Sequence, residues 1–192
     1  VNVPFPICNM LNDNFSLSKE EMEIINNVFE YKDFENLSFD HKFIFFEECF
    51  SFDNHNNYDI KIIEELAHII GKNRIIIKLH PRSKTDRFTT LGYDVMKDIN
   101  YIWEIFALNN SSSDLTLIAF SSGALLNYLF FSNSKMKSIL LYKLFPDKYP
   151  HMNDSDTRRW FEEFVMVHNK SVKVPESFES LKNLLSFSGI DS

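Results

Sequence analysis

The sequence has little cysteine and glycine, and it has no apolar run long enough to cross a bilayer. Its two cysteines, Cys8 and Cys49, stand far apart, which excludes the disulfide framework of a small secreted domain. A membrane-spanning helix needs about 20 apolar residues in succession, and no segment approaches that length. No signal peptide is recognisable, so we expect a cytoplasmic protein, with peripheral association at the inner face of the membrane as an alternative.

The chain is also acidic, and it lacks the motifs of several common enzyme classes. The formal net charge of −7 argues against a nucleic-acid partner. There is no G-x-x-x-x-G-K, no G-x-G-x-x-G and no G-x-S-x-G, and the six histidines and two cysteines show no zinc spacing. We therefore expect no metal and no other cofactor.

Apolar residues are abundant, and their pattern indicates the fold class. With 20 Phe among 192 residues, the chain can bury the core of one well-packed domain. From residue 42 onward, short apolar runs typical of buried strands alternate with stretches of helical spacing. Strands are predicted over 42–46, 75–79, 115–120, 138–142 and 164–167, and helices over 63–70, from 124 onward and over 178–187. This alternation predicts an α/β fold with about five or six parallel strands.

The first 41 residues differ from the rest. Ser18 and Glu21 have the spacing of a capping box, and apolar residues at helical spacing follow, which predicts a helix over 19–31. We expect 1–41 to be a helical and irregular N-terminal segment with a linker, and 42–192 to be a ligand-binding domain. The helix should pack against that domain, or against a second copy of the chain in a homodimer.

Ligands of open parallel sheets bind beyond the carboxyl ends of the strands, so the residues that follow each predicted strand are the candidates for a site. After the first strand these are Glu47, Glu48, Asp53 and Asp59; after the second, His80, Pro81, Arg82, Ser83, Lys84 and Arg87; after the third, Ser121, Ser122 and Gly123.

Two of these groups favour an anionic ligand. His80 ends a buried strand and precedes a proline, so its imidazole could donate to a phosphate or exchange a proton near neutral pH. Ser121 and Ser122 stand at a strand-to-helix turn, where hydroxyls and free N–H groups can hold an anion. A structural histidine and a simple helix cap are the alternatives. Both groups should lie on one edge of the sheet, where a single phosphate could contact them.

Two further carboxylate features lie outside these turns. Glu104 beside Trp103 is either an exposed helix carboxylate or a fork for two ribose hydroxyls. Asp154-Ser155-Asp156 matches a D-x-D metal motif, but its place in a polar turn before a helix favours a capping role.

Three segments together resemble a known family. They are Lys78-Leu79-His80-Pro81-Arg82, Trp103-Glu104 and Phe120-Ser121-Ser122-Gly123-Ala124-Leu125-Leu126. In this order they resemble the nucleotide-binding half of the bacterial sialyltransferases of glycosyltransferase family 52, over residues 42 to about 187. The resemblance implies a Rossmann-like domain of the GT-B architecture, which binds the donor CMP-sialic acid.

The resemblance also implies roles for individual residues. His80 would contact the CMP phosphate and act as general acid on the leaving group. Ser121 and Ser122 would hold the phosphate, and Glu104 would hold the ribose. The remaining substrate-binding positions are Pro81, Arg82 and Gly123.

For the general base, the resemblance implies a carboxylate after the first strand, either Asp59 or Asp53. The reaction would transfer sialic acid, with inversion and without a metal, to a surface glycan such as lipooligosaccharide or capsule. Two departures from the family stand out. The chain is short for a two-domain enzyme, and Trp103 precedes Glu104 where the family has proline.

Two other functions stay open. One is a related GT-B transferase with another activated donor, of the capsule or teichoic-acid type. The other is a non-catalytic domain that binds a nucleotide without transferring a sugar.

Overall fold

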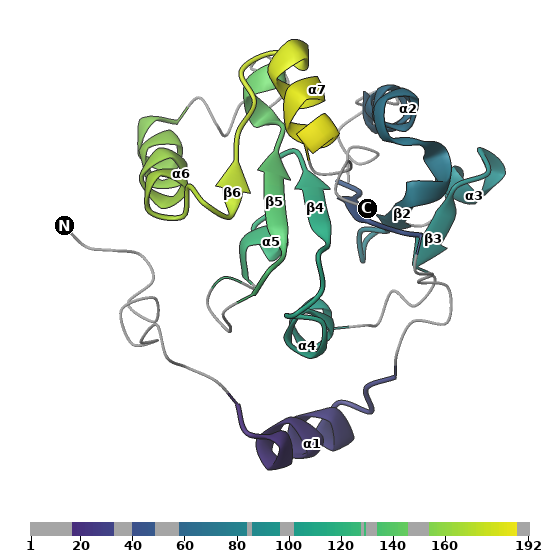
Figure 1. Ribbon diagram of the computed structural model, residues 1–192, viewed down its shortest axis with the longest axis vertical. Helices are drawn as coiled ribbons and strands as arrows, with labels where there is room; N and C mark the ends of the chain where they lie inside the picture. Colours follow the sequence, from purple (N-terminus) through teal and green to yellow (C-terminus); the bar gives the residue numbers. More distant parts are fainter. Residues whose placement is uncertain are drawn as a thin grey trace.

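A single sheet of six parallel strands forms the centre of the molecule, in the order β3-β2-β1-β4-β5-β6 (Figure 1). The computed structural model describes residues 17–32, 40–48, 58–83, 86–96, 102–127, 129, 134–145 and 154–187. The strands are β1 (Phe43–Phe46), β2 (Ile75–Lys78), β3 (Asp94–Met96), β4 (Thr116–Ala119), β5 (Lys137–Leu140) and β6 (Val172–Lys173). The predicted α/β class with a parallel sheet is therefore confirmed.

The central strands are apolar on both faces, which is why the sequence shows them as continuous runs. All four residues of β1 and of β4 are buried. Phe45 of β1 pairs with Ile77 of β2 on one side and with Ile118 of β4 on the other. Such strands form where helices cover both faces of a parallel sheet.

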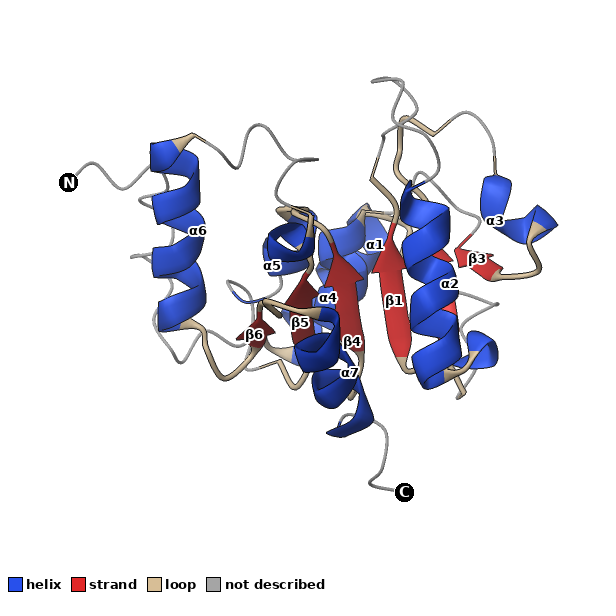
Figure 2. Cartoon of the chain, turned by 90° about the horizontal axis from the view of Figure 1, so that it is seen from above, coloured by secondary structure: helices blue, strands red, loops and turns tan. Residues whose placement is uncertain are grey.

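Helices cover the two faces of the sheet in the manner this pattern requires (Figure 2). α2 (Tyr58–Ile70) and α7 (Phe178–Phe187) contact each other on one face, and α4 (Trp103–Asn109) and α5 (Ala124–Asn127) contact each other on the opposite face. The remaining helices of the domain are α3 (Arg87–Thr90), α6 (Ser155–Val167) and the 3-10 turns η3 (Lys72–Arg74) and η5 (Tyr142–Leu144). Among the residues that the structure describes, no helix is long and apolar enough to span a membrane.

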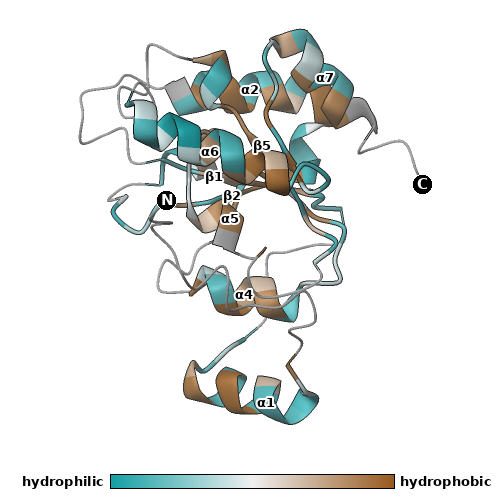
Figure 3. Ribbon diagram, turned by 90° about the vertical axis from the view of Figure 1, so that its left-hand side faces the viewer, coloured by the Kyte–Doolittle hydropathy of each residue, from teal (hydrophilic) through white to brown (hydrophobic). Residues whose placement is uncertain are grey.

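The N-terminal helix α1 (Lys19–Val28) lies against α4, at the far end of the molecule from α2 and α7 (Figure 3). The predicted capping box is present, since the Ser18 hydroxyl accepts from the Glu21 N–H and the Glu21 carboxylate accepts from the Ser18 N–H. The helix ends three residues before the predicted boundary of 31. Asn26 and Asn109 exchange two side-chain hydrogen bonds of 2.9 and 2.8 Å, which attach α1 to α4.

One predicted strand is wrong, and two strands were not predicted. Residues 164–167 belong to α6, where Phe164 lies one turn after Trp160 and their rings stack with centroids 5.4 Å apart. Asp154 caps this helix by accepting a 2.8 Å hydrogen bond from the Thr157 N–H, as the sequence predicts. The strands β3 and β6 have only three and two residues, too few for a readable apolar run.

The strand order identifies the fold as Rossmann-like and gives the position of its ligand crevice. From β1 the chain moves outward through β2 to β3, and it then returns to the other side of β1 and moves outward again from β4 to β6. The direction reverses between β1 and β4. In such sheets the crevice at this reversal, outside the carboxyl ends of the strands, is where ligands bind.

Truncating a side chain of the central strand should test how far the core depends on it. Phe45 is fully buried, and its ring meets that of Phe120 edge-on with centroids 6.1 Å apart. We expect Phe45→Ala to lower the free energy of unfolding by about 3–5 kcal/mol, measured by urea denaturation. Val167→Ala is the control, because this side chain is 73% exposed and should change stability by less than about 0.5 kcal/mol. Equal effects of the two substitutions would contradict this account of the core.

Candidate functional site

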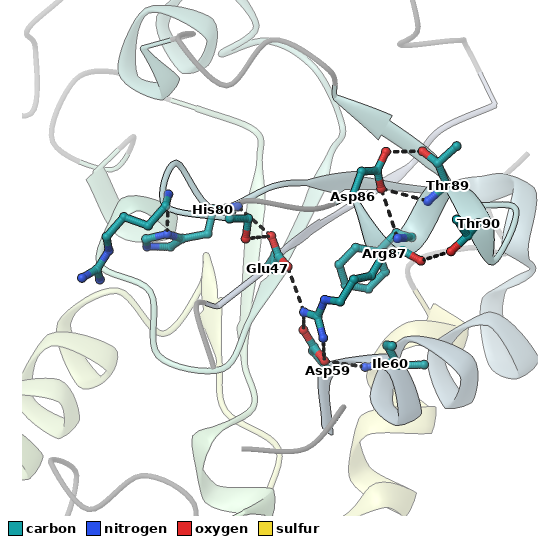
Figure 4. A network of polar contacts seen from close by, with 11 residues as sticks. Glu47, Asp59, Ile60, His80, Asp86, Arg87, Thr89 and Thr90 are labelled. Atoms are coloured by element: carbon teal, nitrogen blue, oxygen red, sulfur yellow. Dashed lines mark hydrogen bonds and ion pairs between the residues drawn. The ribbon is translucent and has the colours of Figure 1, made fainter. Parts of the chain in front are cut away.

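A buried carboxylate, Glu47, organises the end of β1 (Figure 4). Its side chain is only 2% exposed. Its Oε2 accepts a 3.0 Å hydrogen bond from the His80 N–H and another from the Ser83 hydroxyl, while its Oε1 accepts a 2.9 Å hydrogen bond from Nη2 of Arg87. Glu47 therefore fixes the backbone of the loop after β2 and pairs with a cation from α3.

Arg87 pairs with a second buried carboxylate, Asp59 at the start of α2 (Figure 4). Asp59 is completely buried, and its Oδ1 accepts hydrogen bonds from Nη1 of Arg87 at 3.3 Å and from the Ile60 N–H at 2.9 Å. Asp86 caps α3 through the Phe88 and Thr89 N–H groups, which sets Arg87 at the first position of that helix. Burial alone would lower the pKa of Arg87, but its bonds to Glu47 and Asp59 outweigh burial and raise it. One guanidinium thus serves two carboxylates.

His80 is held as a neutral ring with a defined tautomer. Its Nδ1 accepts a 3.1 Å hydrogen bond from the Arg82 N–H, so the proton of the neutral ring is on Nε2. Burial lowers the pKa of His80, and repulsion from Arg82 and Lys78 lowers it further, against a smaller opposing effect of Glu47. At pH 7 the ring is therefore a hydrogen-bond donor through Nε2.

Glu48 and Ser121 contact each other beyond the ends of β1 and β4, where the strand order reverses. The Ser121 N–H donates to Oε1 of Glu48 at 2.6 Å, and the Ser121 hydroxyl lies 3.5 Å from the same oxygen. Burial raises the pKa of Glu48 to about 7, repulsion from Asp59 adds to this, and the hydrogen bonds from Ser121 and Phe120 oppose it. Near neutral pH this carboxyl group is populated in both protonation states.

The pairing of the strands sets three of these residues level with one another. Phe46 pairs with Lys78, so Glu48 and His80 both lie two residues past that pair. Phe45 pairs with Ile118, so Glu48 and Ser121 both lie three residues past that pair. Glu48 therefore lies between the predicted histidine and the predicted serine, on the middle one of three adjacent chain segments.

Glu104 lies near the end of β2, through its position in the first turn of α4. Burial lowers the pKa of Lys78 at the end of β2, and the negative charge of Glu104 opposes this shift. The neighbouring Trp103 is 4% exposed, and its ring meets Phe46 edge-on with centroids 4.7 Å apart. Within the described residues, the indole Nε1 of Trp103 is buried without a hydrogen-bond partner, a loss of about 1–3 kcal/mol.

The structure brings most of the predicted site residues to one edge of the sheet. His80, Ser121 and Ser122 follow β2 and β4, and Glu104 opens α4. Pro81 and Arg82 are exposed beside His80, and Gly123 is exposed with open space where a Cβ would stand.

The two predicted general bases have different outcomes. Asp59 is turned toward Arg87 and has no exposed surface, so it could meet an acceptor hydroxyl only after leaving the guanidinium. Asp53 lies outside the described residues.

Sequence reasoning named Glu47, Glu48 and Arg87 but gave them no role. The available signal was the position of Glu47 and Glu48 just after β1 and of Arg87 in the basic stretch that follows β2. Their partners depend on the strand order and register, which the sequence alone does not contain. In the part of the chain that the structure describes, no group of three or more His, Cys, Asp or Glu side chains is arranged to hold a metal ion.

Comparisons of the chain with protein-family models, with curated proteins and with solved structures find no match. The function of the chain therefore has to follow from the residues of the site and from the sequence motifs.

Replacing Glu48 by glutamine should change how stability depends on pH. The folded protein keeps the Glu48 proton up to about pH 7, whereas an unfolded glutamate releases it near 4.5, so ionisation of Glu48 destabilises the fold as pH rises between these values. We compare the free energy of unfolding of Glu48→Gln with that of the parent, by urea denaturation at pH 5 and at pH 8. The variant should be more stable relative to the parent at pH 8 than at pH 5, by about 2 kcal/mol.

The control for this experiment is Glu65→Gln, which removes the same charge from an exposed position on α2. It should show no such gain. If the difference between Glu48→Gln and the parent is the same at pH 5 and pH 8, then Glu48 does not titrate in the way described above.

Proposed function

We propose that this chain is the donor-binding domain of a glycosyltransferase, and that its donor is CMP-sialic acid. The observation that supports this best is the level arrangement of His80, Glu48 and Ser121 across the reversal point of a Rossmann-like sheet. Strands β2 and β4 flank β1, so their ends lie about 10 Å apart, a span that a nucleoside monophosphate can bridge. The choice of CMP-sialic acid among activated sugars rests on the motif resemblance.

In this proposal the phosphate binds at the ends of β2 and β4. His80 donates from Nε2 to a phosphate oxygen, because its Nδ1 is already engaged by Arg82. The Ser121 and Ser122 backbone and hydroxyl groups donate to the other oxygens. A bound phosphate would raise the pKa of His80. For the ring to act as general acid, Nδ1 must take up a proton and lose its hydrogen bond from the Arg82 N–H, and the Nε2 proton can then pass to the leaving group.

Glu104 is proposed to hold the ribose hydroxyls, next to Lys78. The acceptor hydroxyl attacks the anomeric carbon of the sugar, the bond from that carbon to the phosphate breaks, and a carboxylate takes the proton of the hydroxyl. Asp53 and Asp59 remain the proposed bases for this step, and in the case of Asp59 the contact with Arg87 would first have to open.

A panel of nucleotides tests the proposal. A ligand that binds only the folded state stabilises it by RT ln(1 + [L]/Kd), which is about 2.7 kcal/mol at 100 Kd. We expect CMP to raise the melting temperature more than UMP, AMP or GMP at equal concentration. Equal shifts for all four would remove the cytidine assignment and favour a transferase with another donor. No shift with any of them would refute nucleotide binding.

Substitutions of His80 test its role in the proposed site. His80→Ala should weaken CMP binding by about 1–3 kcal/mol, the scale for leaving a charged acceptor without its donor. His80→Gln keeps a donor and should recover part of the affinity, while Ser122→Ala should cost less, since backbone N–H groups remain. Calorimetric titration with CMP measures all three.

The matched control is His68→Ala, on the exposed surface of α2. It should bind CMP like the parent. If His80→Ala also binds CMP as tightly as the parent, His80 has a purely structural role and the phosphate does not lie at this position.

A further inference from the structure

The donors that an anion would use at the end of β4 already have an acceptor within the protein. The Ser121 N–H donates to Oε1 of Glu48 at 2.6 Å, and the Ser121 hydroxyl lies 3.5 Å from that oxygen. A phosphate oxygen that takes these donors must displace the carboxylate of Glu48. The displaced carboxylate would then lie beside the anion that replaced it.

The charges around Glu48 make this exchange unfavourable while Glu48 is ionised. Asp59 of α2 repels it directly. Glu47 follows β1, and Arg87 of α3 is already shared between Glu47 and Asp59. Two carboxylates therefore already share the one guanidinium at this edge, and Glu48 is repelled by one of them, Asp59.

The other neighbouring elements carry charges of both signs, and the cation Arg82 is exposed beside His80. His80, past the end of β2, has a lowered pKa and is neutral. The turn after β4 supplies the uncharged Ser121 and Ser122. On the α4 side, the charge of Lys78 at the end of β2 is opposed by that of Glu104.

We propose that Glu48 exchanges with the anionic ligand by taking up a proton, so that each ligand binds together with one proton from solvent. This inference rests on the proposed function. The carboxylate gains the proton on one oxygen, and the Ser121 N–H transfers its hydrogen bond from Glu48 to a phosphate oxygen. When the ligand leaves, the proton returns to solvent and Oε1 of Glu48 again accepts the hydrogen bond from the Ser121 N–H.

The direction of the pH dependence follows from the free state. Burial raises the pKa of Glu48 to about 7, and a bound anion nearby would raise it further. Below about pH 6 Glu48 already carries its proton, so this group takes up none when the ligand binds. Above about pH 7 one proton must be taken up per ligand, and the affinity should fall by up to tenfold per pH unit.

Calorimetry of CMP binding to the full chain tests this, in two buffers of different ionisation enthalpy at pH 6 and pH 8. For the parent we expect uptake of close to one proton at pH 8, and weaker binding at pH 8 than at pH 6. Glu48→Gln should take up about one proton fewer at pH 8 and bind CMP about five- to tenfold more tightly than the parent there. At pH 6 the two should agree within about twofold.

Glu65→Gln is the charge-matched control, and it should behave as the parent at both pH values. Protons gained or lost by CMP itself contribute equally to all three proteins, so they cancel when the proton uptake of the proteins is compared. If the parent and Glu48→Gln bind CMP with the same proton uptake and the same pH dependence, the inference is wrong and the proposed function is unaffected. If none of the proteins binds CMP at either pH, the proposed function fails and the inference fails with it.

Discussion

The carboxyl edge of the sheet depends on the pairing of Arg87 with Glu47 and Asp59. This pairing joins the end of β1, the start of α2 and the start of α3. Removing one partner of a buried ion pair typically costs about 3–5 kcal/mol, because the remaining charge stays buried without compensation. Glu47 in turn holds the His80 backbone and the Ser83 hydroxyl. One carboxylate oxygen of Glu47 is paired with Arg87, and the other holds the backbone of His80. The position of His80, which the proposed function needs, therefore depends on the ion pair between Glu47 and Arg87.

Much of the fold could be predicted because burial on both faces leaves a simple pattern in the sequence. β1, β2 and β4 are read directly from their apolar runs, and the capping groups Ser18 and Asp154 indicate where two helices begin. The short outer strands could not be predicted, since the two residues of β6 form a strand only by pairing with β5. The apolar run at 164–167 has the composition of a strand, but contacts one turn apart place it on a helix.

The candidate site could be predicted only as a set of residues on one edge. His80 and Ser121 follow strands, and the rule that ligands bind at the carboxyl edge is general for parallel sheets. The position of Glu48 between them depends on two strand registers, and its pKa near 7 depends on how deeply the fold buries it. The engagement of Asp59 with Arg87 likewise arises because the fold brings the starts of α2 and α3 together, and no local pattern in the sequence contains it.

The attachment of α1 through amide side chains has a consequence for the dynamics of the protein. No residue of α1 is fully buried, and its polar contacts with α4 include the reciprocal bonds of Asn26 and Asn109, followed just after the helix by a 3.2 Å hydrogen bond from Asn110 to the Tyr31 hydroxyl. A hydrogen bond contributes a net stabilisation of about 1 kcal/mol, far less than the free energy gained by burying the apolar side chains of the sheet. We therefore expect the helix to leave the domain and return in a local opening reaction, at a free energy well below that of global unfolding. In each such opening the surface of α4 beneath it is exposed to solvent while the six-stranded sheet stays intact.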